Sequence, residues 1–170
     1  MITREMRRRI EAIVPQAAGA DHIDVKSAVG NATLRECVSR MLSYKPGWYR
    51  GLFALRGRLA GLLGLRHDGL CDDLTITAEN LGFAPGDQAL FFTVTAAREE
   101  EFWAAEASDK HLRAWIAVFF DEFPHGARRY HAATCVVYEN ALGPVYFNLI
   151  RPFHHLIAAV MLHHAVKARP

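Results

Sequence analysis

The stretch VYFNLIRPFHHLIAAVMLHHAVKA, residues 145–168, decides the fold of this chain. Its apolar residues recur with helical spacing, which predicts one long amphipathic helix at the C-terminus. Pro152 is expected near the first turn of this helix, or else at a kink within it. The predicted apolar face consists of Ile150, Phe153, Leu156, Ile157, Val160 and Met161.

A succession of strands is predicted in front of this helix. The first, His22 to Val29, alternates apolar and polar residues, as a half-buried strand does. Turn signals such as Pro85-Gly86-Asp87 separate the later ones, and such short connections imply antiparallel hairpins. The later predicted strands are Leu74 to Asn80, Ala89 to Ala96, Glu101 to Ala107, His111 to Phe120 and Arg129 to Asn140.

Two helices are predicted between the first strand and the rest. The first runs from Leu34 to Tyr44, with Asn31 or Thr33 as its N-cap, and Pro46-Gly47 ends it. The second, Trp48 to Leu65, gathers its leucines on one side and its glycines on the other. A long sheet must cover its inner face, and the C-terminal helix is the long element left to do so. The order predicts an α+β fold: strand, two helices, curved antiparallel sheet, long C-terminal helix.

The composition of the chain limits the classes of protein to which it can belong. A chain of 170 residues, 51% hydrophobic and 22% charged, has the size of one domain with a substantial core. Its 20 Lys and Arg against 18 Asp and Glu give no general reason to bind a polyanion, so nucleic acid is not an expected partner. We expect residues 1–20 to be a basic lead-in, mobile or draped over the surface. Residues 21–170 are expected to form a single domain.

The cysteines and the apolar runs of the sequence predict the cellular compartment of the protein. Cys37, Cys71 and Cys135 are odd in number and widely spaced, which favours neither a disulfide framework nor a thiolate zinc site. The apolar stretch ending at Pro15 is too short for a signal peptide, and no uninterrupted run reaches the roughly 18 to 20 apolar residues of a membrane span. We therefore expect a cytoplasmic protein. A monomer is physically possible, and a homodimer remains open.

Three blocks of sequence resemble a family. They are Pro46-Gly47-Trp48 with Leu55-Arg56 and Leu62-Leu63-Gly64-Leu65, then Asp109-Lys110-His111-Leu112, and finally Tyr138 to Gly143 followed by Tyr146 and Ile150-Arg151-Pro152-Phe153-His154. Over about residues 22–165 the chain is similar to a bacterial family of unknown function within the START-like (SRPBCC, helix-grip) superfamily. Similar domains also occur fused behind NAD-binding domains of the short-chain-dehydrogenase type.

The resemblance implies a sheet that grips a helix around an internal cavity for lipids, polyketides or other apolar molecules. It implies no catalytic residues, because none is assigned in the family. No glycine fingerprint of a dinucleotide site occurs in the sequence, so no cofactor is expected.

Nine histidines raise the question of a metal. On the terminal helix His155 and His163 are eight residues apart, about 12 Å along the axis, whereas metal ligands lie about 2 Å from the ion. The spacing therefore argues against a metal site along the helix. His154 and His164 lie on or beside the apolar face, and His155 and His163 lie away from it. His154 is the candidate pocket histidine, although a satisfied structural role is the more common fate of such a residue.

Further candidates come from the sheet. Asp109 could orient His111 as in an acid/base pair, or the two could simply make a turn. Arg113 and Trp115 share a strand face with His111, which could line a cavity or face solvent. Tyr138 could pack its ring and lend a hydroxyl to a pocket. The predicted ligand-binding set is His154, His111, Tyr138, Trp115, Arg113 and Asp109.

Three functions remain open at this point. The leading prediction is a binding domain for a small, mostly apolar molecule held between sheet and terminal helix. The second is an enzyme of the cyclase or dehydratase kind that uses a pocket histidine as general acid/base. The third is a non-catalytic interaction or regulatory module, which a large exposed apolar patch would support.

Overall fold

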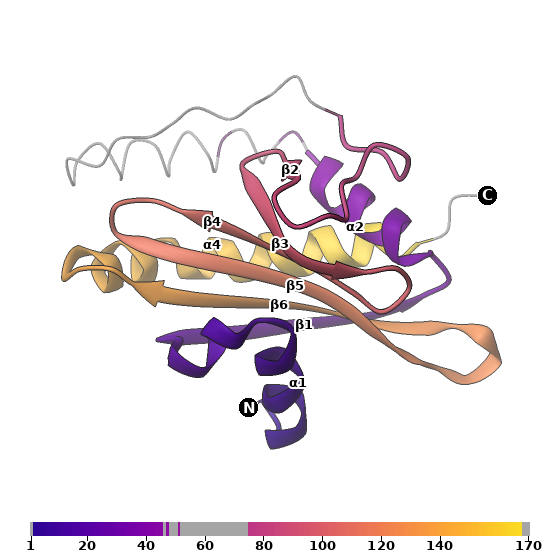
Figure 1. Cartoon of the computed structure of the whole chain (residues 1–170), viewed down its shortest axis with the longest axis horizontal. Helices are drawn as coiled ribbons and strands as arrows, with labels where there is room; N and C mark the ends of the chain where they lie inside the picture. Colours follow the sequence, from indigo (N-terminus) through magenta and orange to yellow (C-terminus); the bar gives the residue numbers. More distant parts are fainter. Residues whose placement is uncertain (1, 46, 48–50, 52–74, 168–170) are drawn as a thin grey trace.

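A computed structural model describes residues 2–45, 47, 51 and 75–167. Its strands form one antiparallel sheet in the order β1-β6-β5-β4-β3-β2, and the C-terminal helix α4 runs along one face of that sheet (Figure 1). The helices are α1 (Arg4–Ile13), α2 (Leu34–Ser43) and α4 (Leu142–Ala165), with short 3-10 helices η1 (Pro15–Gly19) and η2 (Pro124–Gly126). The strands are β1 (His22–Gly30), β2 (Gln88–Ala89), β3 (Phe92–Arg98), β4 (Phe102–Ser108), β5 (Leu112–Glu122) and β6 (Arg128–Tyr138). This is the predicted helix-grip architecture.

The face of the sheet toward α2 and α4, here called the inner face, carries the main core. Alternation sends even-numbered residues of β5 and β6 to this face, so that Val118, Tyr130 and Ala132 pack with Leu162 of α4 and Leu34 of α2. Trp103 of β4 is completely buried in the same cluster. Burial against both helices therefore fixes which face of each strand turns inward.

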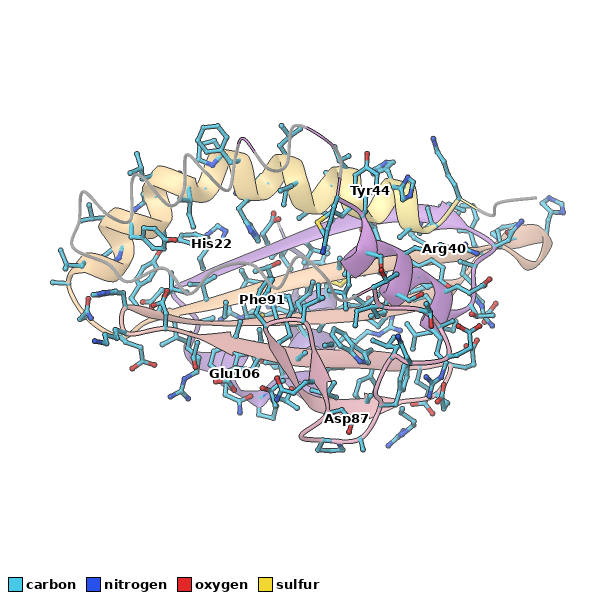
Figure 2. The ribbon with its side chains drawn as sticks, turned by 90° about the horizontal axis from the view of Figure 1, so that it is seen from above. His22, Arg40, Tyr44, Asp87, Phe91 and Glu106 are labelled. Atoms are coloured by element: carbon cyan, nitrogen blue, oxygen red, sulfur yellow. The ribbon has the colours of Figure 1, made fainter. Side chains whose placement is uncertain are left out.

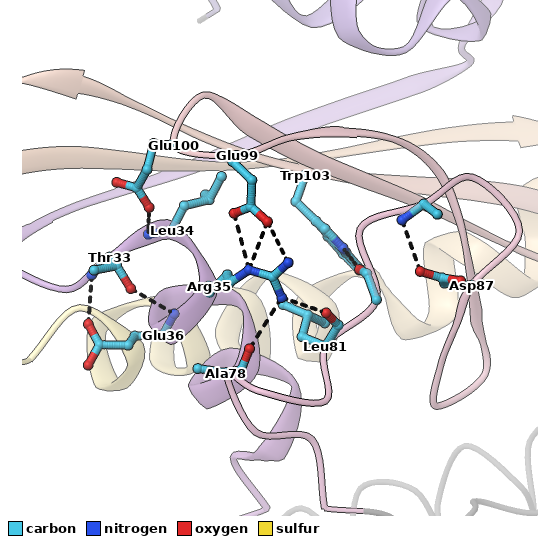
Figure 3. Close-up of polar contacts among 12 residues, drawn as sticks. Thr33, Leu34, Arg35, Glu36, Ala78, Leu81, Asp87, Glu99, Glu100 and Trp103 are labelled. Atoms are coloured by element: carbon cyan, nitrogen blue, oxygen red, sulfur yellow. Dashed lines mark hydrogen bonds and ion pairs between the residues drawn. The ribbon is translucent and has the colours of Figure 1, made fainter.

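Helix α2 is fixed at its N-terminus and along one side. The Thr33 side chain accepts from the backbone N–H of Glu36, and the Glu36 carboxylate accepts from that of Thr33, a capping box that selects Thr33 over Asn31 (Figure 3). Arg35 of the same helix binds the Glu99 carboxylate and donates to the Ala78 and Leu81 carbonyls (Figure 3). One guanidinium thus joins α2 to the β3–β4 turn and to the segment after residue 75.

The start of α4 lies very close to the sheet. A Cβ on Gly143 would lie 2.5 Å from the His111 carbonyl oxygen and 3.0 Å from Cβ of Tyr138, so a side chain here would push the helix away. Asn140 accepts from the backbone N–H of Leu142 at 3.0 Å and donates to the Lys110 carbonyl at 2.8 Å. The block Tyr138 to Gly143 is therefore the junction between β6, the β4–β5 turn and α4.

The N-terminal segment, which the sequence predicts to be mobile or draped over the surface, is packed against the sheet. Ile10, Val14 and Ala17 are at most 1% exposed, and they pack with Trp115 and Phe119 on the face opposite α4, here called the outer face. The apolar residues of α1 and its C-cap, at positions 6, 10, 13 and 14, do recur at helical spacing, a signal of an amphipathic helix that the expectation of a lead-in did not use. The outer face, itself apolar over β4, β5 and β6, supplies the partner surface that the sequence pattern of residues 1–20 did not reveal.

Several predicted boundaries change. Residues 75–80 form coil and turn, and not the end of a strand, because Thr77 and Asn80 bond reciprocally and the Leu81 N–H donates to the Thr77 carbonyl. The predicted strand 89–96 is split by a turn at Leu90, whose φ is 60°. Pro152 lies inside α4, beyond its first turn. The predicted helix 48–65 lies almost wholly outside the described residues.

Within the described residues, α4 has the length and apolar composition of a membrane span. It contacts α2, β1 and β6, however, and its residues Tyr146, Phe147, Leu162 and Ala165 are buried in these contacts. Packing against these elements accounts for only part of its apolar character, because five large apolar side chains of α4 are exposed: Leu142, Val145, Leu149, Phe153 and Leu156.

We expect Ile10→Ala to lower the free energy of unfolding by about 2 to 4 kcal/mol, because it empties a fully buried position between α1 and the sheet. Chemical denaturation followed by tryptophan fluorescence measures this change. Arg8→Ala, at an exposed position of the same helix, is the matched control and should leave stability within about 0.5 kcal/mol. Equal stability of Ile10→Ala and the wild type would contradict a packed N-terminal segment.

Candidate functional site

A polar cluster lies between β1 and α4, on the inner face of the sheet. Alternation along β1 turns His22, Asp24 and Lys26 toward α4, while Ile23 and Val25 join the outer cluster with α1. His22 lies between the helix and the strands in Figure 2. The alternation in the sequence separates these two sets but does not tell which of them faces α4.

Lys26 connects the β1 side of this cluster to the α4 side. The Lys26 ammonium, which can only donate, lies 2.9 Å from Oδ1 of Asp24 and 3.1 Å from Nδ1 of His155 on α4. Nδ1 of His155 is also 3.1 Å from Oδ2 of Asp24, so the ammonium, the carboxylate and the imidazole lie together. Burial alone would raise the pKa of Asp24, but the Lys26 hydrogen bond and the neighbouring positive groups outweigh it and lower the pKa.

Two half-buried imidazoles in this cluster each have a nitrogen that is itself buried and unsatisfied. Nε2 of His22 and Nε2 of His154 are inaccessible to solvent and have no hydrogen-bond partner in the described part of the chain. Burial lowers the pKa of His154 to about 4, and burial followed by the nearby His155 lowers that of His22. Both rings are therefore neutral at neutral pH.

Aromatic rings border the two histidines. The Phe147 ring, only 3% exposed, lies 4.9 Å from that of His22, 6.2 Å from that of His154 and 6.0 Å from that of Tyr138. Residues 157–161 continue α4 as a half-buried, mainly apolar run. The polar nitrogens are thus bordered by apolar surface. Of the predicted residues, the structure brings His154 and Tyr138 to this region.

Asp109 and His111 take the turn alternative. Oδ1 of Asp109 accepts from the backbone N–H groups of His111 and Leu112 at 2.7 and 2.9 Å, which closes the β4–β5 turn. Nδ1 of His111 lies 3.0 to 3.2 Å from the side-chain amide of Asn140. These contacts hold the junction with α4, and the Asp109 carboxylate bonds backbone rather than the His111 ring.

Arg113 and Trp115 lie on the outer face, which separates them from His154 by the thickness of the sheet. Trp115 packs under α1 with Ile10 and Phe119, and the Arg113 guanidinium is 3.4 Å from the carboxylates of both Glu106 and Glu139. The sequence grouped them correctly on one strand face. That face is turned to α1, because Val118 and Phe120 take the inner side of β5.

His22, Asp24, Lys26, His155 and Phe147 belong to the cluster, but the sequence did not single them out. Alternating charged residues on β1 were the available signal, read in the sequence as a solvent face. His155 lies off the apolar stripe of α4 but still reaches Lys26, since a long side chain from the sheet spans the gap. His164, a weaker candidate, stacks on Tyr44 with ring centroids 4.1 Å apart.

Among the described residues, no group of three or more His, Cys, Asp or Glu side chains is placed to hold a metal ion. Cys37 and Cys135 are buried free thiols, and burial raises the pKa of each to about 12. Neither thiol is a thiolate at neutral pH.

An antiparallel sheet gripping a long C-terminal helix, with polar groups between them, defines a helix-grip protein. The profile of one family matches residues 16–161, and the chain belongs to this family, described as protein of unknown function DUF2867. A comparison with curated proteins found no significant match.

Solved structures of similar arrangement include truncated norcoclaurine synthase from Thalictrum flavum, at 12% identity and a TM-score of 0.42 over 84% of this chain and 91% of that one. Hypothetical protein jhp0584 from Helicobacter pylori has 11% identity and a TM-score of 0.44 over 92% and 93%. The major latex protein family member At1g70830 from Arabidopsis thaliana has 10% identity and a TM-score of 0.36 over 84% and 94%. Likeness at this level transfers neither ligand nor activity.

We predict that stability falls as the pH drops from about 6.5 toward 4. In this window the unfolded chain protonates His154, whose ordinary pKa is 6.5, while the folded chain with a pKa of about 4 does not. The lowered pKa of Asp24 acts mainly below its ordinary value of 3.8. Denaturant titrations between pH 4 and 7.5 should show a shallower slope for His154→Gln, and an unchanged one for the exposed control His163→Gln. A wild-type stability independent of pH in this window would contradict a buried neutral His154.

Proposed function

We propose that this protein binds a small, mostly apolar molecule between the inner face of the sheet and α4, with His154 and His22 as its polar contacts. The observation that carries the proposal is the pair of buried Nε2 atoms without a partner in the described residues. Leaving one buried polar group unsatisfied costs about 1 to 3 kcal/mol, so a bound group that pairs with these nitrogens gains correspondingly. Two such groups on facing elements indicate a place for a ligand.

The surroundings indicate the kind of ligand. Phe147 and Tyr138 border the histidines with aromatic surface, which favours an apolar or aromatic body. Because burial keeps His22 and His154 neutral, they suit a hydroxyl, carbonyl or similar uncharged group. Lys26 and Asp24 neutralise each other at the rim of the cluster. The proposed ligand is an apolar molecule with one or two hydrogen-bonding groups.

One observation favours an acid/base enzyme as a second candidate. Oδ2 of Asp24 lies 3.1 Å from Nδ1 of His155. The neutral His154 lies beside this pair, with its ring centroid 6.1 Å from that of His155. A neutral imidazole near a carboxylate can take a proton from a bound substrate and return it elsewhere, as cyclisation and dehydration require. Proton exchange of a bound carbonyl compound in D₂O, lost in His154→Leu, would favour this enzyme over a pure binding protein.

The test of binding uses 1-anilinonaphthalene-8-sulfonate as the fluorescent probe, with native mass spectrometry for stoichiometry. We expect one saturable site, weakened about fivefold to tenfold in His154→Leu, since the loss of one hydrogen bond is worth about 1 kcal/mol. Arg113→Ala, an exposed substitution on the outer face, is the matched control and should bind as the wild type does.

Equal affinity of the wild type, His154→Leu and His22→Phe would remove these histidines from the site. The binding proposal itself would be contradicted if neither the probe nor a mixed bacterial lipid extract showed any saturable binding.

A further inference from the structure

A second polar cluster lies on the outer face, away from α4. Ser27, His131 and Asp121 come from the neighbouring strands β1, β6 and β5. Ser27 is directly opposite His131 in the register of β1 with β6, and Asp121 is opposite Arg129, two residues before His131. All three side chains point to the outer face because they share its parity with Val25, Ala133 and Phe119. The sheet itself places a hydroxyl, an imidazole and a carboxylate in a row.

The three groups form a continuous hydrogen-bonded chain. Oγ of Ser27 is 2.8 Å from Nδ1 of His131, and Nε2 of His131 is 2.9 Å from Oδ2 of Asp121. A carboxylate can only accept, so Nε2 of the neutral ring carries the proton and Nδ1 is left with its lone pair. The Ser27 hydroxyl therefore donates to His131. This is the ground-state arrangement of a serine whose proton a base can remove.

The environment supports a base at this position. His131 is 4% exposed, and burial outweighs the attraction of Asp121 and lowers its pKa, so the ring is neutral at neutral pH. The charged groups that face it are Asp121 of β5, Arg129 of its own strand and Arg9 of α1. Arg9 forms an ion pair with Asp121 and donates to the Phe120 carbonyl at 2.6 Å, which fixes the carboxylate. Ser27, by contrast, is exposed and can be approached from solvent.

We propose that Ser27 is a nucleophile for acyl transfer from activated esters, with His131 as its general base and Asp121 as the positioning residue. Oγ of Ser27 attacks the acyl carbon while its proton passes to Nδ1 of His131. The bond from the acyl carbon to the leaving oxygen then breaks, and the leaving alcohol takes that proton. Water, losing a proton to His131, releases the acid, and Ser27 recovers its proton from the ring.

A purely structural role makes a different prediction. The same contacts also tie α1 to the sheet through Arg9, and removing them would lower stability in either case. Only a nucleophile reacts covalently, so the test follows a covalent bond. An alkyl fluorophosphonate suits it: Oγ of Ser27 bonds phosphorus, fluoride leaves, and His131 takes the hydroxyl proton.

The experiment incubates the full chain with this fluorophosphonate and follows adducts by intact-mass spectrometry and peptide mapping. We expect one adduct, on Ser27, absent from Ser27→Ala and formed at least about a hundredfold more slowly in His131→Gln. Ser108→Ala, at an exposed serine of β4, is the matched control and should label at the wild-type rate. In the wild type the labelling rate should rise with pH as His131 loses its proton. Because the pKa of His131 is lowered, the rate should reach its plateau before the pH rises to 6.5, the ordinary pKa of histidine.

Peptide mapping of the wild type alone is decisive, whether or not the variants fold. Labelling of Ser27 no faster than that of Ser108 would overturn the proposal and leave the cluster as an attachment for α1. Undiminished labelling in a folded His131→Gln variant, checked by circular dichroism, would overturn the role of His131 as base.

Discussion

The close approach of α4 to the sheet is the constraint on which the rest of the structure depends. It is set at both ends of the helix by positions that tolerate no side chain. A Cβ on Gly143 would lie 2.5 Å from the His111 carbonyl oxygen, and one on Gly30 would lie 2.0 Å from that of Val166. Between these two points the helix has little freedom to move outward. The spacing between β1 and α4, and with it the separation of His22 from His154, follows from this pair of contacts.

Much of the architecture could be predicted from the sequence, because periodicity and turn residues report directly on burial. The strand β1 and the helix α4 both appear in the structure, with boundaries shifted by a few residues, but Phe153 and Leu156 of the predicted apolar face of α4 are exposed. One of the misplaced elements has a local cause. Residues 75–80 look extended by composition, yet the Thr77 and Asn80 side chains bond the backbone and close a turn. The apolar residues of α1 have helical spacing, but the sequence does not tell that their partner is the outer face of the sheet.

The candidate site was less predictable, because the side to which a strand face turns is decided by tertiary packing. His154 was recognised from its place beside the apolar stripe of α4. Trp115 and Arg113 were grouped on the right strand face, but α1 covers that face. His22, Asp24 and Lys26 looked like a solvent-facing row until α4 was laid over them. The spacing of histidines along α4 tells which of them cannot share a metal ion. It does not reveal that Lys26, from β1, contacts His155.

Strand β6 serves both faces at once. Its even-numbered residues, such as Tyr130 and Ala132, enter the core under α4, and its odd-numbered residues, such as His131 and Cys135, enter the core under α1. A slip of β6 by a single residue against β1 and β5 would exchange these two sets. An imidazole would then be forced into the main core and a tyrosine beneath α1, so both cores would lose their packing together. A chain with β6 in the wrong register therefore cannot keep the native packing on either face. The native register is favoured over its neighbours by the packing of both cores at once.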